Sequence, residues 1–202
     1  MTEQTKFIER PLVLRDDEAA QKLMDVSHTL NWQFIRDNAE LAASEHVQET
    51  VWSPREQVFV HLVTDGPTRS RSVYVSSTPD AIARAVGVLE FLVDTLDFCS
   101  LDELSSDATE AATEKQRAIA LVRLGMGAPK DYEERVFTLL EGGFRHPHPT
   151  VRNAAIWATR FALWPQFIPL MERMKDEDPE PILQSVAADT IEIYRESGVT
   201  SQ

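Results

Sequence analysis

A pattern of helix-forming residues near the C-terminus recurs after 32 residues, from Val151 to Leu183, and constrains the fold more than any other feature of the chain. The matching positions of the two copies are Pro147, Val151, Arg152, Ala154 and Ala155, then Pro179, Leu183, Gln184, Val186 and Ala187. A helical motif recurring at this interval indicates stacked helix pairs, because each pair buries its apolar face only against a neighbouring pair. We therefore expect a short helical stack in the C-terminal half.

The remaining signals in this half are also helical, and they are separated by turn-forming residues. We expect breaks at residues 125–130 and 142–149, near Pro165, and at residues 178–181, which leaves about five helices from Lys115 onward. Ala155 and Ala187 are expected where two helix axes cross, since a small side chain permits close approach. The helical stack is therefore expected over residues 115–202.

The segment from His146 to Ala155 resembles the start of a HEAT-like repeat, in which a proline-bearing turn opens a helix with a Val-Arg-x-x-Ala core. Residues 178–188 resemble a second copy, and residues 116–121 resemble an earlier, less regular copy at an offset of 35. Gln184 departs from the arginine that the family favours at its position. The resemblance covers residues 112–195 and implies a helical repeat stack with a binding surface.

The N-terminal half mixes helical and strand periodicities, which predicts an α+β module over residues 1–100. Apolar residues at helical spacing predict a first helix, and they are Leu23, Val26, Leu30 and Phe34,. Residues 58–63 and 72–76 predict two strands joined by the turn residues 65–68,. We expect a helix, two or three antiparallel strands and a second helix, with the helices covering one sheet face.

The second helix of this module is expected to begin after Thr78, whose hydroxyl would cap it, with Pro79 in its first turn,. Its predicted buried stripe comprises Ile82, Val86, Leu89, Val93 and Leu96. Beyond it, residues 101–114 are rich in Asp, Glu, Ser, Thr and Ala, which predicts an acidic, polar connector between the two halves.

The chain is acidic throughout, and this bounds the partners it can bind. It carries 20 basic and 33 acidic residues, a net charge of −13, with −7 in residues 1–100 and −6 in residues 101–202. Such a surface repels phosphate backbones and anionic lipids, so we expect neither nucleic acid nor membrane as a partner. It favours association with a basic protein. The absence of a long apolar run or a leader sequence makes the cytoplasm the expected location.

The chain lacks the recognised catalytic motifs, including a Gly-rich phosphate loop, His-Glu-x-x-His, paired cysteines and Gly-x-Ser-x-Gly,. Cys99 is the only cysteine, and His146 and His148 are the only close histidine pair. Two ligands are too few for a metal, so we expect these two to be exposed loop histidines, and we expect His61 to be packed and hydrogen-bonded. We therefore predict no catalytic, cofactor-binding or metal-binding residue.

Two acidic clusters and one aromatic–arginine group are the candidate partner-binding features. Acids at the end of a helix oppose the helix dipole, which favours a functional explanation for residues 172–178. Large aromatic residues with arginine often anchor interfaces. The candidate partner-binding residues are Glu133, Glu134, Glu172, Asp176, Glu177, Asp178, Trp164 and Arg160.

Taken together, these features favour a non-catalytic protein-binding factor that captures its partner through acidic helical surfaces. An inhibitor or immunity-type protein that blocks a basic enzyme is the specific hypothesis, because an acidic binder can occlude a site built for an anionic substrate. Two alternatives stay open: an enzyme or lyase-type accessory subunit with a HEAT-like fold, and a structural, self-assembling module.

Overall fold

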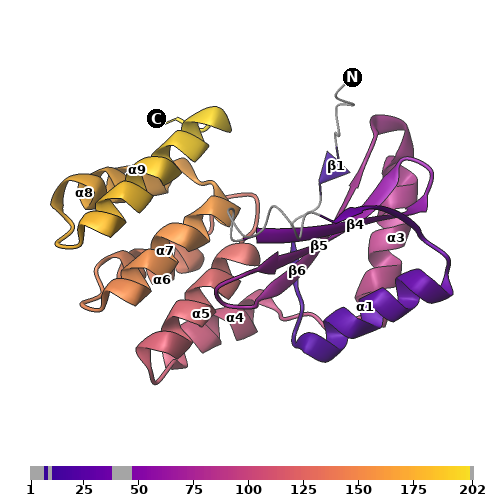
Figure 1. The fold of residues 1–202 in the computed structure, drawn as a ribbon, viewed down its shortest axis with the longest axis horizontal. Coiled ribbons are helices and arrows are strands. Elements are labelled where there is room, and N and C mark those ends of the chain that lie inside the picture. The colour runs from indigo at the N-terminus through magenta and orange to yellow at the C-terminus, as the bar shows by residue number, and fades with distance from the viewer. Residues whose placement is uncertain (1–6, 9–10, 38–46, 201–202) are drawn as a thin grey trace. The chain divides into compact units, whose positions relative to one another are not determined.

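The computed structural model describes residues 7–8, 11–37 and 47–200, and the chain forms two compact units, residues 1–99 and 100–202 (Figure 1). In the described residues, the first unit contains an antiparallel sheet and the α-helices α1 and α3, and the second unit is helical without strands. The predicted fold class, an α+β module followed by a helical stack, is therefore confirmed.

The sheet of the first unit has the strand order β1-β6-β5-β4-β3, with β2 also paired to β6. Its described strands are β1 (Phe7–Ile8), β2 (Leu12–Val13), β3 (Gln33–Asp37), β4 (Val47–Arg55), β5 (Val58–Asp65) and β6 (Arg71–Ser77). All of the pairings are antiparallel. Because β3 ends the strand order, its outer side is an edge of the described sheet.

The predicted hairpin is confirmed by β5 and β6, which pair Val60 with Val75. The carboxylate of Asp65 shapes the turn by accepting the Thr68 backbone N–H at 2.8 Å,. Pro54 lies within β4 and does not end it. The β4–β5 register shifts between Trp52 and Arg55, and such an irregularity lets proline stay within a strand,.

The first helix, α1 (Asp17–Thr29), begins where Asp16 accepts the Ala19 backbone N–H at 2.9 Å. The predicted apolar stripe of this helix included Leu30 and Phe34. These two positions are wrong, because the helix ends at Thr29. Asn31 adopts a positive φ of 50°, which reverses the chain direction, and Phe34 lies in β3. Three residues separate α1 from β3. The four-residue spacing from Val26 to Leu30 and Phe34 therefore does not reflect a continuous helix.

The second helix of this unit, α3 (Ile82–Thr95), follows a 3-10 turn at Pro79–Ala81 and buries an unexpected face. Ala85, Val88 and Leu92 are its buried residues, and they join the core formed with α1 and strands β4 to β6. The predicted stripe is wrong at three positions, since Ile82, Val86 and Val93 are 41%, 38% and 52% exposed. The smaller face lets the helix lie closer to the sheet.

Thr78 takes the predicted place before this helix but does not cap it. Its side chain forms no cap hydrogen bond, and its buried Oγ1 has no hydrogen-bond partner among the described residues. Pro79 in the first turn is therefore the part of the predicted helix start that the structure retains,.

Residues 100–200 form six described α-helices arranged as three hairpins, α4–α5, α6–α7 and α8–α9, which lie side by side (Figure 1). The helices are α4 (Leu101–Glu110), α5 (Glu114–Met126), α6 (Glu134–Phe144), α7 (Pro149–Ala162), α8 (Ile168–Glu177) and α9 (Pro181–Glu196), with a 3-10 turn at Pro165–Phe167. Helix α7 packs against both α5 and α9, while α6 contacts α4 and α8.

Helix α4 lies within the segment that composition predicted as a connector. Ser100 and Glu103 form a reciprocal capping box at its start, and Leu104, Ser105 and Ala108 are buried. One large apolar residue and two small ones suffice to pack this helix against α5 and α6, so its polar composition hides its structural role. The connector prediction is thus wrong for residues 101–110.

Small residues set the spacing of the inner helices. A Cβ on Gly143 would lie 2.8 Å from the Ala155 Cβ, and a Cβ on Gly125 would lie 2.4 Å from the Ala158 carbonyl oxygen. Because real Cβ atoms essentially never come this close, α7 packs directly on the backbones of α5 and α6. The predicted location of Ala155 at a close helix approach is confirmed, and Ala187 is likewise fully buried.

Candidate functional site

The predicted acidic residues do not meet at one place. Glu133 caps α6 by accepting the Val136 backbone N–H at 2.7 Å, and Glu134 follows it in the first turn. A cavity of about 290 Å³ is lined by residues 144–146 and 173–174 and by residues 177–179, so the C-terminal ends of α6 and α8 are neighbours. Glu133 and Glu134 lie at the opposite end of α6, about 16 Å of helix away.

The acidic residues of α8 alternate with basic ones. Glu172, Asp176 and Glu177 are exposed, but Arg173 and Lys175 are interspersed among them. The Lys175 Nζ lies 3.6 Å from the Asp176 Oδ1. Neighbouring charges of opposite sign cancel much of the field that would attract a basic partner.

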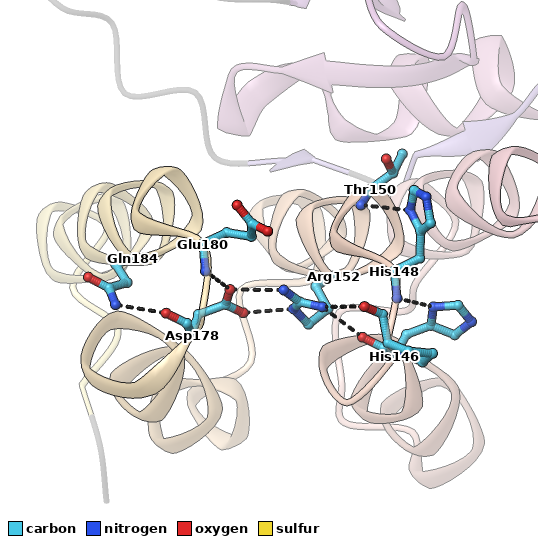
Figure 2. A network of polar contacts seen from close by, with 8 residues as sticks. His146, His148, Thr150, Arg152, Asp178, Glu180 and Gln184 are labelled. Atoms are coloured by element: carbon cyan, nitrogen blue, oxygen red, sulfur yellow. Dashed lines mark hydrogen bonds and ion pairs between the residues drawn. The ribbon is translucent and has the colours of Figure 1, made fainter.

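Asp178 is buried rather than available to a partner, which corrects its predicted role. It is 7% exposed and accepts two hydrogen bonds from Arg152, at 2.7 Å from Nε and 3.0 Å from Nη2 (Figure 2). It also accepts the Glu180 backbone N–H at 2.9 Å. Burial raises the pKa of Asp178, but the hydrogen bonds from Arg152 and from the Glu180 backbone, together with the Arg152 charge, leave the pKa below its ordinary value.

Arg152 contacts two turns at once. Besides binding Asp178, its Nη1 donates to the carbonyl oxygens of His146 and Pro147 at 3.0 and 2.9 Å (Figure 2). The guanidinium therefore links the turn before α7 to the turn before α9 through four hydrogen bonds, and both charged residues are buried,.

The contact with the carbonyl six residues earlier recurs in each hairpin. Arg117 donates to the Ala111 oxygen at 3.1 Å, Arg152 to the His146 oxygen, and Gln184 to the Asp178 oxygen at 2.7 Å. These three donors occupy the positions that the 35- and 32-residue offsets align. Gln184, which departs from the expected arginine, thus keeps the local contact (Figure 2).

Trp164 and Arg160 face the interior of the helical unit. Trp164 is 2% exposed, and its indole N–H is shared between the carbonyl oxygens of Pro129 and Lys130 at 3.2 Å each. Arg160 donates to the Thr190 hydroxyl at 3.0 Å, and its guanidinium lies 4.2 Å from the centre of the Trp157 ring. Trp164 is therefore removed from the predicted docking surface, and Arg160 is engaged within the unit.

The close histidine pair shapes a turn. The His146 Nδ1 accepts the His148 backbone N–H at 3.1 Å, and the His148 Nδ1 accepts the Thr150 backbone N–H at 3.2 Å (Figure 2). His148 is thus the N-cap of α7. The described residues contain no group of three or more His, Cys, Asp or Glu side chains arranged to hold a metal ion.

The sheet carries a cluster of polar side chains around His61 that the sequence did not predict. The two ring nitrogens of His61 lie 3.0 Å from the Glu49 Oε1 and 2.7 Å from the Ser76 Oγ, and the His61 ring stacks on Tyr74 at 4.1 Å. The Tyr74 hydroxyl and Arg36 also donate to Glu49. The prediction that His61 is packed and hydrogen-bonded is confirmed.

The order Ser76–His61–Glu49 is that of a serine nucleophile, its base and an orienting carboxylate. Ser76 is, however, 3% exposed within a paired strand, so an acyl substrate cannot reach its hydroxyl without opening the sheet. The hydrogen bonds, chiefly from His61, hold the pKa of Glu49 at about 2, whereas burial and the Glu49 contact raise the pKa of Tyr74. The cluster therefore fastens three adjacent strands together.

An open groove of about 660 Å³ lies on the first unit. Its lining is apolar except for two arginines and comprises Leu30, Trp32, Pro54, Arg55, Arg84, Gly87, Val88 and Phe91. These residues come from the segment between α1 and β3, the end of β4 and one flank of α3. The sequence gives no sign of the groove, because its residues come from three separate segments.

The exposed large hydrophobic residues are concentrated on this same unit. Among the described residues, eight of the ten belong to it, and the other two are Tyr132 and Ile182. The eight are Met24, Leu30, Phe34, Ile35, Ile82, Val86, Phe91 and Val93. Two of the eight, Leu30 and Phe91, line the groove, and exposed apolar side chains gathered at one site are typical of an interaction surface,.

Comparisons with protein families, curated proteins and solved structures find no match to this chain. None of the described helices has the length and apolar character needed to cross a bilayer.

Proposed function

We propose that the chain is a protein-binding factor whose docking surface lies on the first unit, around the groove beside α3. The observation that carries this proposal is the concentration of exposed apolar side chains on that unit, next to an open groove. Keeping these side chains in water costs free energy, about 25 cal/mol for each Å² left unburied, and a bound partner would recover it.

We further propose that the second unit is a HEAT-like stack of three helix hairpins. The support is the hydrogen bond that Arg117, Arg152 and Gln184 each make to a carbonyl six residues earlier. Helix α7 packs on the backbones of α5 and α6 at Gly125 and Gly143, which favours a rigid stack.

The experiment compares proteins recovered from the native cells by the full chain and by two variants. In the first, Leu30→Ser with Phe91→Ser removes groove side chains that are 52% and 38% exposed. In the control, Ile182→Ser removes a side chain on α9 that is 69% exposed. We expect a partner in stoichiometric amount that the control keeps and the groove variant loses. Absence of any retained protein, or equal retention by both variants, would contradict the proposal.

Capture of a basic partner through acidic helices stays a second candidate. It is favoured by the net charge of −13 and by the exposed carboxylates Glu134, Glu172 and Glu177. Raising the ionic strength from 0.05 to about 0.5 M should then slow association at least tenfold, because salt screens exposed charges. An unchanged association rate excludes electrostatic capture. The enzyme, lyase-subunit and self-assembly alternatives stay predictions.

A further inference from the structure

We propose that the groove receives an extended, acidic segment of a partner protein, which pairs with the edge strand β3 and places apolar side chains against Trp32 and Phe91. This inference rests on the proposed protein-binding function and specifies the chemistry of the partner. It differs from the expectation of a basic partner, since the local charge of the groove is opposite to that of the whole chain.

The apolar part of the groove continues along β3. Trp32 lines the groove and packs on the core of the unit, and Phe34, two residues further in β3, pairs with the core residue Trp52. Phe34 is 58% exposed. The apolar surface therefore extends beyond the groove in the direction of a strand, which favours an extended polypeptide over a compact small molecule.

The charge of the groove selects carboxylates. Arg55 and Arg84 are its only charged lining residues, and neither forms an ion pair with a described residue. Arg84 donates a hydrogen bond from Nη2 to the Oε1 of the uncharged Gln57 at 3.1 Å. The chain as a whole is acidic, with 33 acidic and 20 basic residues. Arg55 and Arg84 nevertheless give the groove a local positive charge, because no described carboxylate forms an ion pair with them.

The edge of the sheet supplies main-chain hydrogen bonds. Among the described strands, β3 pairs with β4 alone, so no described strand occupies its other side. The five residues of β3 span about 17 Å, enough for a strand of similar length,. In strand addition the main chain provides affinity, and pockets for alternate side chains provide specificity.

Gly87 offers a substitution that blocks the groove without disturbing the fold. A Cβ placed there meets no atom within 4 Å, and the residue lies within α3. Gly87→Glu would place a carboxylate among Arg55, Arg84 and Phe91 and would improve helix propensity. Gly142→Glu is the matched control, because Gly142 is also helical and open but lies in α6.

In the experiment, a phage library of random twelve-residue peptides is selected for binding to the full chain. The dissociation constants of the enriched peptides are then measured. We expect peptides that alternate aliphatic or aromatic residues with Asp or Glu. Gly87→Glu should weaken their binding at least tenfold, Gly142→Glu less than twofold, and thermal unfolding should show that both variants are folded. The double variant Arg55→Glu, Arg84→Glu should lose these peptides and bind copies in which Lys replaces each acid.

Four outcomes would overturn the inference: no enriched peptide, enrichment of basic peptides, acidic peptides that bind Gly87→Glu normally, or a dimer of the wild type that Gly87→Glu dissociates. In the last case the occupant is a second copy of the chain. Each of the first three leaves the proposed function intact if a native partner is still lost from the Leu30→Ser, Phe91→Ser variant, so the two proposals fail independently.

Discussion

Arg152 shows how much one buried side chain can organise. It is 7% exposed, and Asp178 provides both of its carboxylate oxygens to it from 26 residues away in the chain. A buried guanidinium is tolerated only when its charge and donors are satisfied, and here the carboxylate and two carbonyl oxygens achieve this. The pair therefore makes the second unit sensitive to the loss of either partner.

Asp178→Ala should lower the free energy of unfolding by about 3–5 kcal/mol, because it leaves the Arg152 charge buried and unpaired. Replacing both residues, as Arg152→Met with Asp178→Ala, should recover at least half of that loss. Urea unfolding followed by circular dichroism measures both values. A loss below 1 kcal/mol for the single variant would show that the guanidinium finds other partners.

Glu49 makes a second residue-scale prediction, on pH dependence. Its pKa falls from 4.5 to about 2 on folding, so its carboxylate stabilises the fold fully above pH 4.5 and the contribution is lost as the pH falls toward 2. The wild type should lose about 2–3 kcal/mol more than Glu49→Gln between pH 5 and pH 2. Denaturant unfolding at several pH values tests this, with Glu56→Gln, an exposed neighbour of the β4–β5 turn, as the control. Parallel curves for Glu49→Gln and the wild type would contradict it.

Residue environments were only partly predictable. The packing of His61 follows from its place in an apolar strand, but its partners Glu49, Tyr74 and Ser76 come from three strands. Which residues meet across strands depends on register, and sequence alone does not fix register here. The same holds for Asp178, whose burial depends on Arg152 of the preceding hairpin.

At the scale of elements, α3 shows why periodicity can identify a helix and misplace its face. Two apolar stripes run along it, one containing Ile82, Val86 and Val93 and the other Ala85, Val88 and Leu92. The larger side chains make the first stripe the more hydrophobic, yet the second packs on the sheet. Small residues permit close helix–sheet contact, an effect of packing geometry that hydrophobicity does not record.

The helical glycines differ in environment and should respond oppositely to alanine. Gly125→Ala should cost at least 2 kcal/mol, since its Cβ would lie 2.4 Å from a backbone oxygen of α7,. Gly87→Ala and Gly142→Ala should each stabilise by about 0.5–1 kcal/mol, because nothing lies within 4 Å and alanine favours the helix,. Thermal unfolding of the three variants gives the comparison. Stabilisation by Gly125→Ala would show that α5 and α7 can move apart.

At the scale of the whole molecule, each unit has its own set of buried residues. The core of the first includes Leu23, Val60 and Leu92, and that of the second includes Ile156 and Met171. Each unit contains about 100 residues, a size at which domains commonly fold alone. The sequence located both halves, because the change from mixed to purely helical periodicity is strong.

We therefore expect a fragment of residues 100–202 to fold by itself. It should show helical circular dichroism and one cooperative thermal transition, since α4 to α9 pack into three adjoining hairpins. The same fragment carrying Gly125→Ala should unfold at a lower temperature, which distinguishes native packing from residual helix. A broad, non-cooperative transition would contradict the prediction.

The difference between Arg152 and Gln184 also bears on how a further helix hairpin could pack after α9. Arg152 reaches backward to its own turn and forward to the acid of the next hairpin, whereas Gln184 makes the backward contact with a shorter, uncharged side chain. A fourth hairpin added after α9 would meet no cation at this position to bind an acid in the turn between its two helices. Duplication of the last hairpin would therefore add a copy without the buried ion pair that joins the second and third hairpins. Among the described residues, the first and second hairpins already pack together in this way, since Arg117 makes only the backward contact.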